Sequence, residues 1–357
     1  MNTTLSTTKK RASGRLFRLV LSLPGFMCLL FWGPTANALT VIPEKGGLSG
    51  YVNVGVGAVD MESSLLSKAA NGIVDVGDPT IDDINSSPDG ETAAIPSLNF
   101  ELSYTFEDSR TQFYVGNLLE DFLTFDLSAE AGVRQGVRGV GVFGLAFVSS
   151  SLAADVWKDP YQAGVKRKDT ERTAQGYRIS WDRILDSGLA VKYSSKSLDI
   201  DDERSGEGLG LSASERSLLD RNGDINRLEV GYELSLSDQR HILTPALVYR
   251  DNDRDGDAMA SEGYGATLNY IYSQNERWRW VFNVAYQSIE YDEVNPVYGV
   301  EDEADQYGVT ATAFYSNPFG WKPWVLNVTA GYFEEDHDIN FYDSSVTAFT
   351  VGMLRRF

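Results

Sequence analysis

The sequence contains few of the residues on which most enzyme chemistry depends. Its 357 residues include one cysteine and two histidines. The cysteine, Cys28, falls in an N-terminal segment that we expect to be removed, which excludes disulfide, zinc-thiolate and cysteine-nucleophile chemistry. Two histidines without a thiol also argue against a transition-metal centre.

Positive charge is also scarce, because 31 Lys and Arg stand against 51 Asp and Glu, a net charge of −20. Affinity for nucleic acid comes mainly from Lys and Arg contacts to phosphates, so we expect no nucleic-acid partner. Disordered chains are poor in aromatic residues, whereas 12% of this chain is aromatic and 42% hydrophobic. The composition therefore indicates an ordered protein.

The first 38 residues have the pattern of a secretory signal peptide. A basic start leads into an apolar stretch over 19–32, and Ala36-Asn37-Ala38 fits a cleavage site after Ala38. An uncleaved anchor helix is the alternative, but Pro24-Gly25 interrupts the stretch, which is short for a span of ~20 apolar residues. We expect residues 1–38 to be a signal peptide and 39–357 to be one exported domain.

No later stretch is long and apolar enough for a membrane helix, and what repeats instead is a two-residue alternation. In Leu98–Phe106 every even position is apolar and every odd position polar. Such a segment forms a strand with one apolar and one polar face. The pattern predicts about fourteen strands, with twelve as the alternative: Leu48–Asp60, Leu98–Phe106, Thr111–Leu118, Phe122–Val133, Val137–Ser149, Ala174–Ile184, Leu189–Ile200, Ile225–Leu236, Ile242–Arg250, Gly263–Ser273, Trp278–Tyr291, Tyr307–Ser316, Trp324–Phe333 and Val346–Phe357.

Alternation alone fits two architectures. In a soluble sandwich the apolar faces form the core, whereas in an outer-membrane barrel they meet lipid and the polar faces line the lumen. Aromatic residues at the ends of the apolar faces, such as Tyr264 with Tyr272 and Trp324 with Tyr332, are typical of a barrel's interfacial girdles. This first feature favours the barrel.

The connections between the expected strands supply a second feature, because they alternate between short and long. Residues 134–136 and 186–188 are short turns, whereas 61–95, 150–173 and 201–224 are long. Short periplasmic turns and long extracellular loops are typical of outer-membrane barrels.

The last expected strand supplies a third feature. It ends on Phe357, which resembles the signal by which the barrel assembly machinery recognises its substrates, although Arg355 stands where that pattern usually has an apolar residue. We therefore predict an all-β fold: a transmembrane, antiparallel, up-and-down β-barrel with long extracellular loops, located in the cell outer membrane.

Several short motifs follow one another along the chain. They are Trp157–Tyr161 with Gly164, Ser205-Gly206 with Leu211-Ser212, Arg221–Asp224, Asp255–Ala258, Tyr264-Gly265, Tyr291-Asp292 with Asn295-Pro296, and Gly320-Trp321 with Trp324. In this order they resemble a family of Gram-negative outer-membrane proteins known only as a domain of unknown function. The resemblance covers essentially the whole mature chain and implies a barrel without a known activity.

The polar faces of the expected strands carry charges of both signs, which are costly in a dry core but stable around water. One interpretation is a water-filled pore whose Arg and Glu rows orient passing solutes, and the other is a salt-bridged plug that closes the barrel. The long segment 61–95 is placed to fold into the lumen and narrow it. The expected lumen-lining residues are Glu101, Asp126, Glu130, Arg178, Asp182, Lys192, Lys196, Arg227, Glu229, Glu233, Arg279, Asn283 and Gln287.

These features predict a passive, porin-like channel for small hydrophilic solutes rather than an enzyme. A closed structural or adhesion barrel acting through its external loops is the alternative, and an outer-membrane hydrolase is third. An Asp–His pair at the barrel mouth can act as a general base, but we expect His241 at the periplasmic rim and His337 solvated in an acidic external loop. The expected partners are outer-membrane lipid, lipopolysaccharide, the barrel assembly machinery and the solutes.

The expected external loops are mostly acidic, notably over 292–305 and 334–338. An acidic mouth concentrates cations within about a Debye length, ~8 Å at physiological salt, so an open pore should prefer cations at low salt. Segment 150–173 is the exception and is expected to meet lipopolysaccharide phosphates. Its basic residues are Lys158, Lys166, Arg167, Lys168 and Arg172.

The segment Asp251–Glu262 fits the twelve-residue calcium-loop pattern, with carboxylates at the first, third, fifth and twelfth places and Gly at the sixth. Strands rather than helices are expected on both sides, so a solvated hairpin tip is the alternative. A site here would bind calcium weakly, at ~0.1–1 mM. Its ligands would be Asp251, Asp253, Asp255, the Asp257 carbonyl and Glu262.

Overall fold

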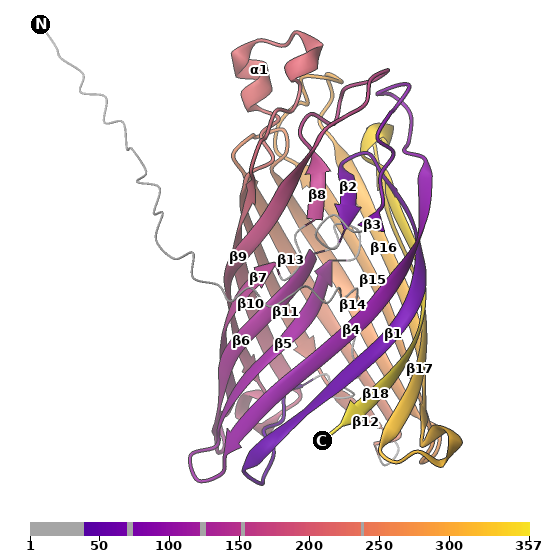
Figure 1. Cartoon of the computed structure of the whole chain (residues 1–357). Helices are drawn as coiled ribbons and strands as arrows, with labels where there is room; N and C mark the ends of the chain where they lie inside the picture. Colours follow the sequence, from indigo (N-terminus) through magenta and orange to yellow (C-terminus); the bar gives the residue numbers. More distant parts are fainter. Residues whose placement is uncertain (1–38, 70–73, 122–125, 151–153, 237–238) are drawn as a thin grey trace, which may run out of the picture.

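A computed structural model shows how the alternating segments pair into one closed antiparallel β-barrel (Figure 1). The structure describes residues 39–69, 74–121, 126–150, 154–236 and 239–357, without the side chains of 118–127. The predicted signal peptide and its cleavage site lie outside these residues. Among the helices of the described part, none has the length and apolar character needed to cross a membrane.

Fourteen strands of the described residues form the wall, and each pairs with the next along the chain. Pairing of the first with the last closes the barrel, and Gly50 and Phe357 exchange backbone hydrogen bonds of 3.0 and 3.1 Å at this seam. The prediction of fourteen strands is confirmed, and the count of twelve is wrong. The strands are β1 (Gly47–Ser63), β4 (Gly90–Phe106), β5 (Thr111–Asp121), β6 (Asp126–Val137), β7 (Gly141–Ser150), β9 (Asp169–Asp182), β10 (Leu189–Ile200), β11 (Gly223–Tyr232) continued by β12 (Leu234–Leu236), β13 (His241–Arg254), β14 (Ser261–Ser273), β15 (Trp278–Tyr291), β16 (Glu303–Ser316), β17 (Trp324–His337) and β18 (Ser344–Arg356).

The remaining elements lie in the connections. Strand β8 pairs with the start of β9, β2 pairs with β8, and β3 with β2. The helix α1 begins after Ser212, which forms a capping box with Glu215. The bounds are β2 (Leu66–Ala69), β3 (Val74–Asp75), β8 (Ala154–Trp157), α1 (Ala213–Ser217), and the 3-10 turns η1 (Ile184–Asp186), η2 (Glu207–Leu209), η3 (Pro318–Gly320) and η4 (Asn340–Tyr342).

The apolar faces of the strands point outward and the polar faces point into the barrel. Phe147 and Leu247 are 57% and 70% exposed, whereas Asn327 and Thr329 are 4% and 2% exposed. A soluble barrel would bury its large apolar side chains, so this arrangement is the one that lipid requires. The sandwich alternative is therefore wrong.

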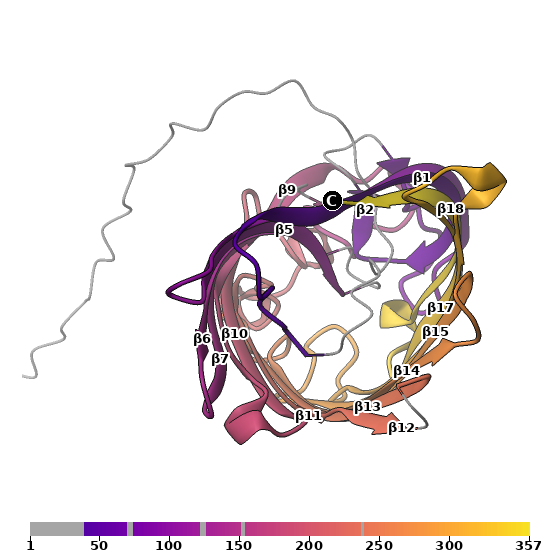
Figure 2. The same ribbon diagram turned by 90° about the horizontal axis from the view of Figure 1, so that it is seen from below.

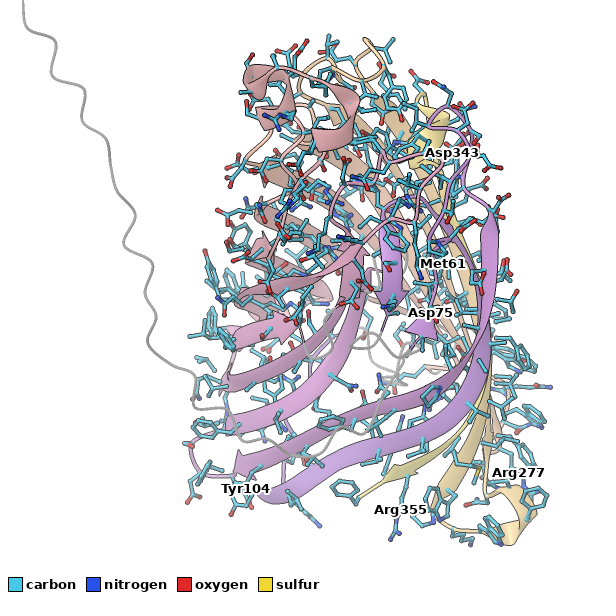
Figure 3. All side chains as sticks on the ribbon, turned by 45° about the horizontal axis from the view of Figure 1, so that its top comes forward. Met61, Asp75, Tyr104, Arg277, Asp343 and Arg355 are labelled. Atoms are coloured by element: carbon cyan, nitrogen blue, oxygen red, sulfur yellow. The ribbon has the colours of Figure 1, made fainter. Side chains whose placement is uncertain are left out.

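The two ends of the barrel differ. Asp343 lies at the end that carries α1, whereas Tyr104, Arg277 and Arg355 lie at the opposite rim, near the C terminus (Figures 1 and 3). Connections at the α1 end include 64–89 and 201–222.

This arrangement makes a prediction about topology. Ser87→Cys should react with an impermeant maleimide on intact cells, whereas Asn275→Cys should react only after the outer membrane is permeabilised, because both sites are exposed but lie at opposite ends. No cysteine follows Cys28, so a labelled band reports one position. Labelling of Asn275→Cys on intact cells would reverse the orientation.

Candidate functional site

Six connections at the α1 end meet over the barrel mouth and share one apolar core. We call their described residues the loop cap: 64–69 with 74–89, 154–168, 201–222, 255–260, 292–302 and 338–343. Side chains that are nearly or fully buried form this core, and partly buried neighbours from the same loops pack against them. The buried members are Tyr161, Leu219, Met259, Ile339, Phe341 and Tyr342.

Two buried tyrosines tie the loop cap together across its centre. The hydroxyls of Tyr161 and Tyr342 lie 2.5 Å apart, and the Asn295 amide donates to the Tyr342 oxygen over 2.7 Å. Burial raises the pKa of Tyr342 to about 12, so this phenol is neutral at physiological pH. Neutral partners can stay in an apolar core because each polar group has a hydrogen bond.

The Arg167 side chain joins two segments of the loop cap by hydrogen bonds. Its guanidinium donates to the carbonyls of Ser64 and Pro160 over 2.9 and 3.0 Å and to the Asp78 carbonyl, and it lies 4.5 Å from the Trp157 ring centre. Burial lowers the pKa of Arg167 to about 10, which still leaves the side chain charged at neutral pH. The expectation that Arg167 meets lipopolysaccharide is wrong, because the side chain is buried.

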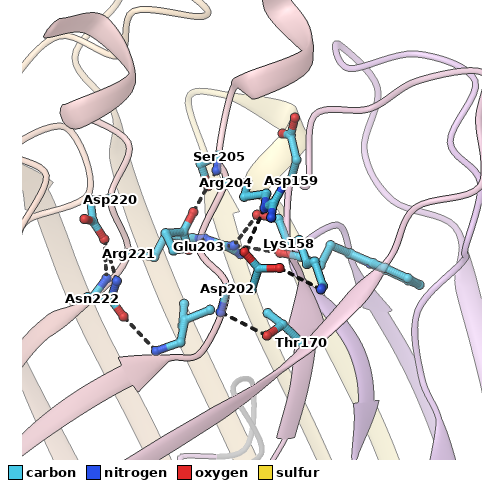
Figure 4. Close-up of polar contacts among 12 residues, drawn as sticks. Lys158, Asp159, Thr170, Asp202, Glu203, Arg204, Ser205, Asp220, Arg221 and Asn222 are labelled. Atoms are coloured by element: carbon cyan, nitrogen blue, oxygen red, sulfur yellow. Dashed lines mark hydrogen bonds and ion pairs between the residues drawn. The ribbon is translucent and has the colours of Figure 1, made fainter. Parts of the chain in front are cut away.

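A polar network joins segment 154–168 to segment 201–222 (Figure 4). Arg221 forms a buried ion pair with Glu203 at 2.8 Å and donates to the Trp157 carbonyl over 2.6 Å. The Asp159 carboxylate accepts from the backbone N–H groups of Gly206 and Gly208, both at 3.0 Å. The cap is therefore held by specific contacts as well as by its apolar core.

Below the loop cap, part of segment 64–89 lies inside the barrel. Seen from below, β2 lies within the ring of wall strands (Figure 2). Leu66 and Val74 of this segment belong to the same buried cluster as the wall residues Met61, Ile200 and Val346. Part of the segment 61–95 that was predicted to enter the lumen therefore lies inside the barrel, whereas its ends, 61–63 and 90–95, belong to the wall strands β1 and β4.

A cavity of about 200 Å³ lies against this inner segment, and we call it the basic chamber. Glu335 is the one Asp or Glu among the described residues that line it. Eight apolar side chains line it: Leu65, Leu66, Val156, Leu198, Ile200, Ile225, Met259 and Ile289. Six basic side chains line it: Arg172, Lys196, Arg221, Arg227, Arg250 and Arg254.

The sequence pattern predicts lumen positions for only Lys196 and Arg227 of these basic residues. Its expected strands begin at Ala174 and end at Arg250, which leaves Arg172 in an external loop and Arg254 in the calcium segment. In the structure β9 begins at Asp169 and β13 continues to Arg254. The sequence nevertheless indicates that Arg250 and Arg254 point inward, because they continue the two-residue alternation of the inward side chains that precede them in β13.

Most of the other predicted lumen residues contact polar side chains of neighbouring strands. Glu101 pairs with Arg134 at 2.9 Å, Glu130 with Arg178 at 2.8 Å, and Glu229 with Arg227 at 3.1 Å and Lys192 at 3.6 Å. Asn283 donates to Thr310 over 2.8 Å. Asp182 and Gln287 are buried, Glu233 and Arg279 are partly buried, and the Asp126 side chain lies outside the described part.

The two histidines have different surroundings. His241 at the start of β13 stacks on Tyr272 and contacts the Tyr270 hydroxyl at 2.7 Å, at the rim opposite the cap as predicted. His337 ends β17 and is buried between Asp302 and Glu335, at 2.8 and 3.0 Å. The expectation of a solvated His337 is therefore wrong. Both of its ring nitrogens are engaged, so neither is available to take a proton from a substrate.

The acidic segment Asp251–Glu262 lies partly in strands β13 and β14, and its calcium site stays a prediction. Asp251 lies in β13 directly opposite Glu262 of β14, so the segment is a strand pair with a tight connection. Alternation along β13 sends Asp251 and Asp253 outward, away from inward-facing Arg254. The described residues contain no group of three or more His, Cys, Asp or Glu side chains placed to hold a metal ion.

The apolar exterior, polar interior and loop cap define a class: a membrane-spanning β-barrel with packed loops at one end. The chain belongs to the family described as protein of unknown function DUF2860, whose profile matches residues 47–355. A search of curated proteins matched none.

The solved structures that resemble the chain include an outer-membrane channel and a transporter. The channel DcaP of Acinetobacter baumannii is 11% identical, with 87% of this chain and 98% of that chain covered and a TM-score of 0.38. The toluene transporter TodX of P. putida is 12% identical, with 88% and 90% covered and a TM-score of 0.39. A FadL homologue of Pseudomonas aeruginosa is 11% identical, with 86% and 90% covered and a TM-score of 0.42. At such identities, what those proteins transport says nothing about this chain.

Proposed function

We propose that this protein is an outer-membrane channel for small solutes, closed at rest by the loop cap. One observation carries the proposal: the segments packed together at the mouth belong to loops and not to the wall. The wall encloses a lumen lined by charged and hydroxyl side chains, and the basic chamber lies directly under the cap. Movement of loops is a common way to open such a path.

The basic chamber supports selectivity for anions. Acidic external loops alone favour cations, but their charges lie in solvent, where salt screens them. Charges inside a narrow, low-dielectric lumen act more strongly on a passing ion. Arg254 lines the basic chamber, and its Nη1 atom is buried without a hydrogen-bond partner among the described residues, so we expect a preference for anions, opposite to the one derived from the loops.

Reversal potentials in a planar bilayer test this. With a tenfold KCl gradient, openings of the purified protein should reverse toward the chloride potential, and Arg254→Gln should weaken this preference. Arg277→Gln, at the exposed rim opposite the cap, is the matched control and should leave it unchanged. Openings that reverse toward the potassium potential would contradict anion selectivity.

A closed barrel that works through its loops is the second candidate. The observation that favours it is the extent of packing inside, where two apolar clusters and the ion pairs of the lumen occupy space that a wide pore needs. Absence of any conductance, including in variants with a weakened loop cap, would establish this candidate and reject the channel.

A further inference from the structure

The lipid-facing surface of β18 ends on an arginine. Arg355 continues the two-residue alternation of Phe349, Val351 and Met353, so its side chain points outward in the same row. It is exposed and lies at the rim opposite the loop cap (Figure 3). A charge in a lipid-facing row is tolerated only near the membrane surface, where lipid head groups begin. The position of Arg355 therefore marks the level of those head groups on the barrel.

A tryptophan on the neighbouring strand contacts this arginine. Trp324 of β17 lies directly opposite Arg355 of β18, and the guanidinium carbon is 5.8 Å from the centre of the Trp324 ring. A cation at this distance from an indole ring is attracted to it. Tryptophan itself is enriched at the interface between membrane and water. The pair therefore holds the guanidinium at the depth of the lipid phosphates.

The turn that leads into β17 adds a second cation and two exposed aromatic rings. Phe319 and Trp321 are 84% and 57% exposed, and their ring centres lie 5.6 Å apart. The Trp324 backbone N–H donates to the Trp321 carbonyl over 3.1 Å and closes the turn around Lys322, which is exposed. Exposed aromatic side chains at a barrel rim are typical of contact with the head-group region. The turn therefore presents Lys322 at the same level as Arg355.

Neither cation is neutralised by a neighbouring side chain. Within the described ranges, Lys322 and Arg355 form no ion pair. The acidic groups of the adjoining turn and strand end are Glu276, which is exposed, and the C-terminal carboxylate of Phe357. Basic residues beside a membrane-spanning segment attract anionic lipid, by about fivefold in affinity for each Lys or Arg.

From these contacts we infer that Lys322, Trp324 and Arg355 bind the head group of an anionic phospholipid. A guanidinium fork matches two phosphate oxygens, and a lysine ammonium binds phosphate as a point charge. Below the head group, Leu326 and Met353 lie opposite each other in the same outward rows and offer a surface for an acyl chain. The inference does not depend on whether the barrel conducts.

Native mass spectrometry of the folded protein in detergent micelles tests the inference. Phosphatidylglycerol and phosphatidylethanolamine with identical dioleoyl chains are titrated in turn, since both carry a phosphate but only the first has a net negative charge. The first phosphatidylglycerol should bind at least about tenfold more tightly, because two cations act on it. Equal affinity would mean that only the acyl chains are bound, and would overturn the inference.

A soluble phosphate distinguishes a lipid site from a simple anion site. Glycerol 3-phosphate at about 1 mM should not displace phosphatidylglycerol, because it makes no contact with the apolar surface below the head group. Displacement at that concentration would assign the two cations to a soluble phosphate compound and reject the phospholipid.

Variants locate the binding. Arg355→Gln and Lys322→Gln should each weaken phosphatidylglycerol binding about fivefold and leave phosphatidylethanolamine binding unchanged. Arg277→Gln is the matched control: Arg277 is exposed at the same rim but precedes β15, three strands and about 14 Å from Arg355.

The control should keep the full preference for phosphatidylglycerol. An equal loss in Arg277→Gln would mean a diffuse basic rim, and an unchanged preference in folded Arg355→Gln and Lys322→Gln would exclude these side chains. Either result would overturn the inference. If both variants fail to fold, the comparison of the two lipids on the unmodified protein still decides it.

Discussion

Replacing Arg167 by alanine should open the barrel mouth. The Arg167 guanidinium satisfies carbonyls from three places in the loop cap, at Ser64, Asp78 and Pro160. Loss of one hydrogen bond to a charged group costs about 1.5–3 kcal/mol, and 1.4 kcal/mol is a factor of ten in an equilibrium. We therefore expect the open probability in a planar bilayer to rise at least about tenfold.

Lys166→Ala is the matched control for this experiment. Lys166 is the preceding residue, carries the same charge, and is exposed. It should leave the open probability within about twofold of the unmodified protein, since exposed charges contribute little. A similar rise in both variants would mean that loop charge, and not the fastening of the loop cap, controls opening. An unchanged open probability in Arg167→Ala would show that the hydrogen bonds of Arg167 do not keep the mouth closed.

The second large effect should be on stability, at the ion pair between Glu101 and Arg134. Two parallel hydrogen bonds of 2.9 Å join these side chains, and the Arg134 guanidinium also lies 3.6 Å from the Tyr114 ring centre. Arg134→Ala leaves the Glu101 carboxylate partly buried without its cation. Breaking a buried pair costs about 3–5 kcal/mol, and the lower end applies because both side chains keep some exposure. Urea unfolding in lipid vesicles should show a loss of about 3 kcal/mol.

The double variant Arg134→Met with Glu101→Gln separates charge from packing. It removes both charges while keeping similar side-chain volumes, so it should recover most of the loss. Arg277→Ala is the control: the exposed Arg277 guanidinium donates to the Tyr315 hydroxyl over 3.2 Å, and its loss should change the unfolding free energy by less than about 1 kcal/mol. An equal loss in the double variant would show that packing, rather than the unpaired charge, dominates.

The motifs that carry the family resemblance gain a structural meaning in the loop cap. Asp159 and Tyr161 come from the first motif, Arg221 from another and Asn295 from a third, and each makes a cap contact described above. Read along the chain, they appear as unrelated polar segments in separate loops. The Tyr161–Tyr342 contact joins positions 181 residues apart, and nothing local in the sequence specifies it.

The alternation of side chains was sufficient to predict the barrel. A strand's two faces are set by residues two apart, and this local rule located all fourteen strands and the lumen positions of residues such as Glu130 and Asn283. Because charged residues are usually typical of loops, the pattern ends the predicted strand at Arg250, although β13 continues through 251–254. A polar residue near a barrel end is stable on either face. The pattern of hydrophobic residues therefore does not show which side chains face inward there.

Tertiary structure alone decided where the basic side chains meet. Arg172, Arg227 and Arg250 belong to different strands, and their distances depend on strand register and on closure of the barrel. The loop cap forms because four connections contribute buried side chains to one core and two more contribute partly buried ones. Such contacts arise between segments that are remote in sequence, so a local pattern predicts the wall of this protein but neither its loop cap nor its basic chamber.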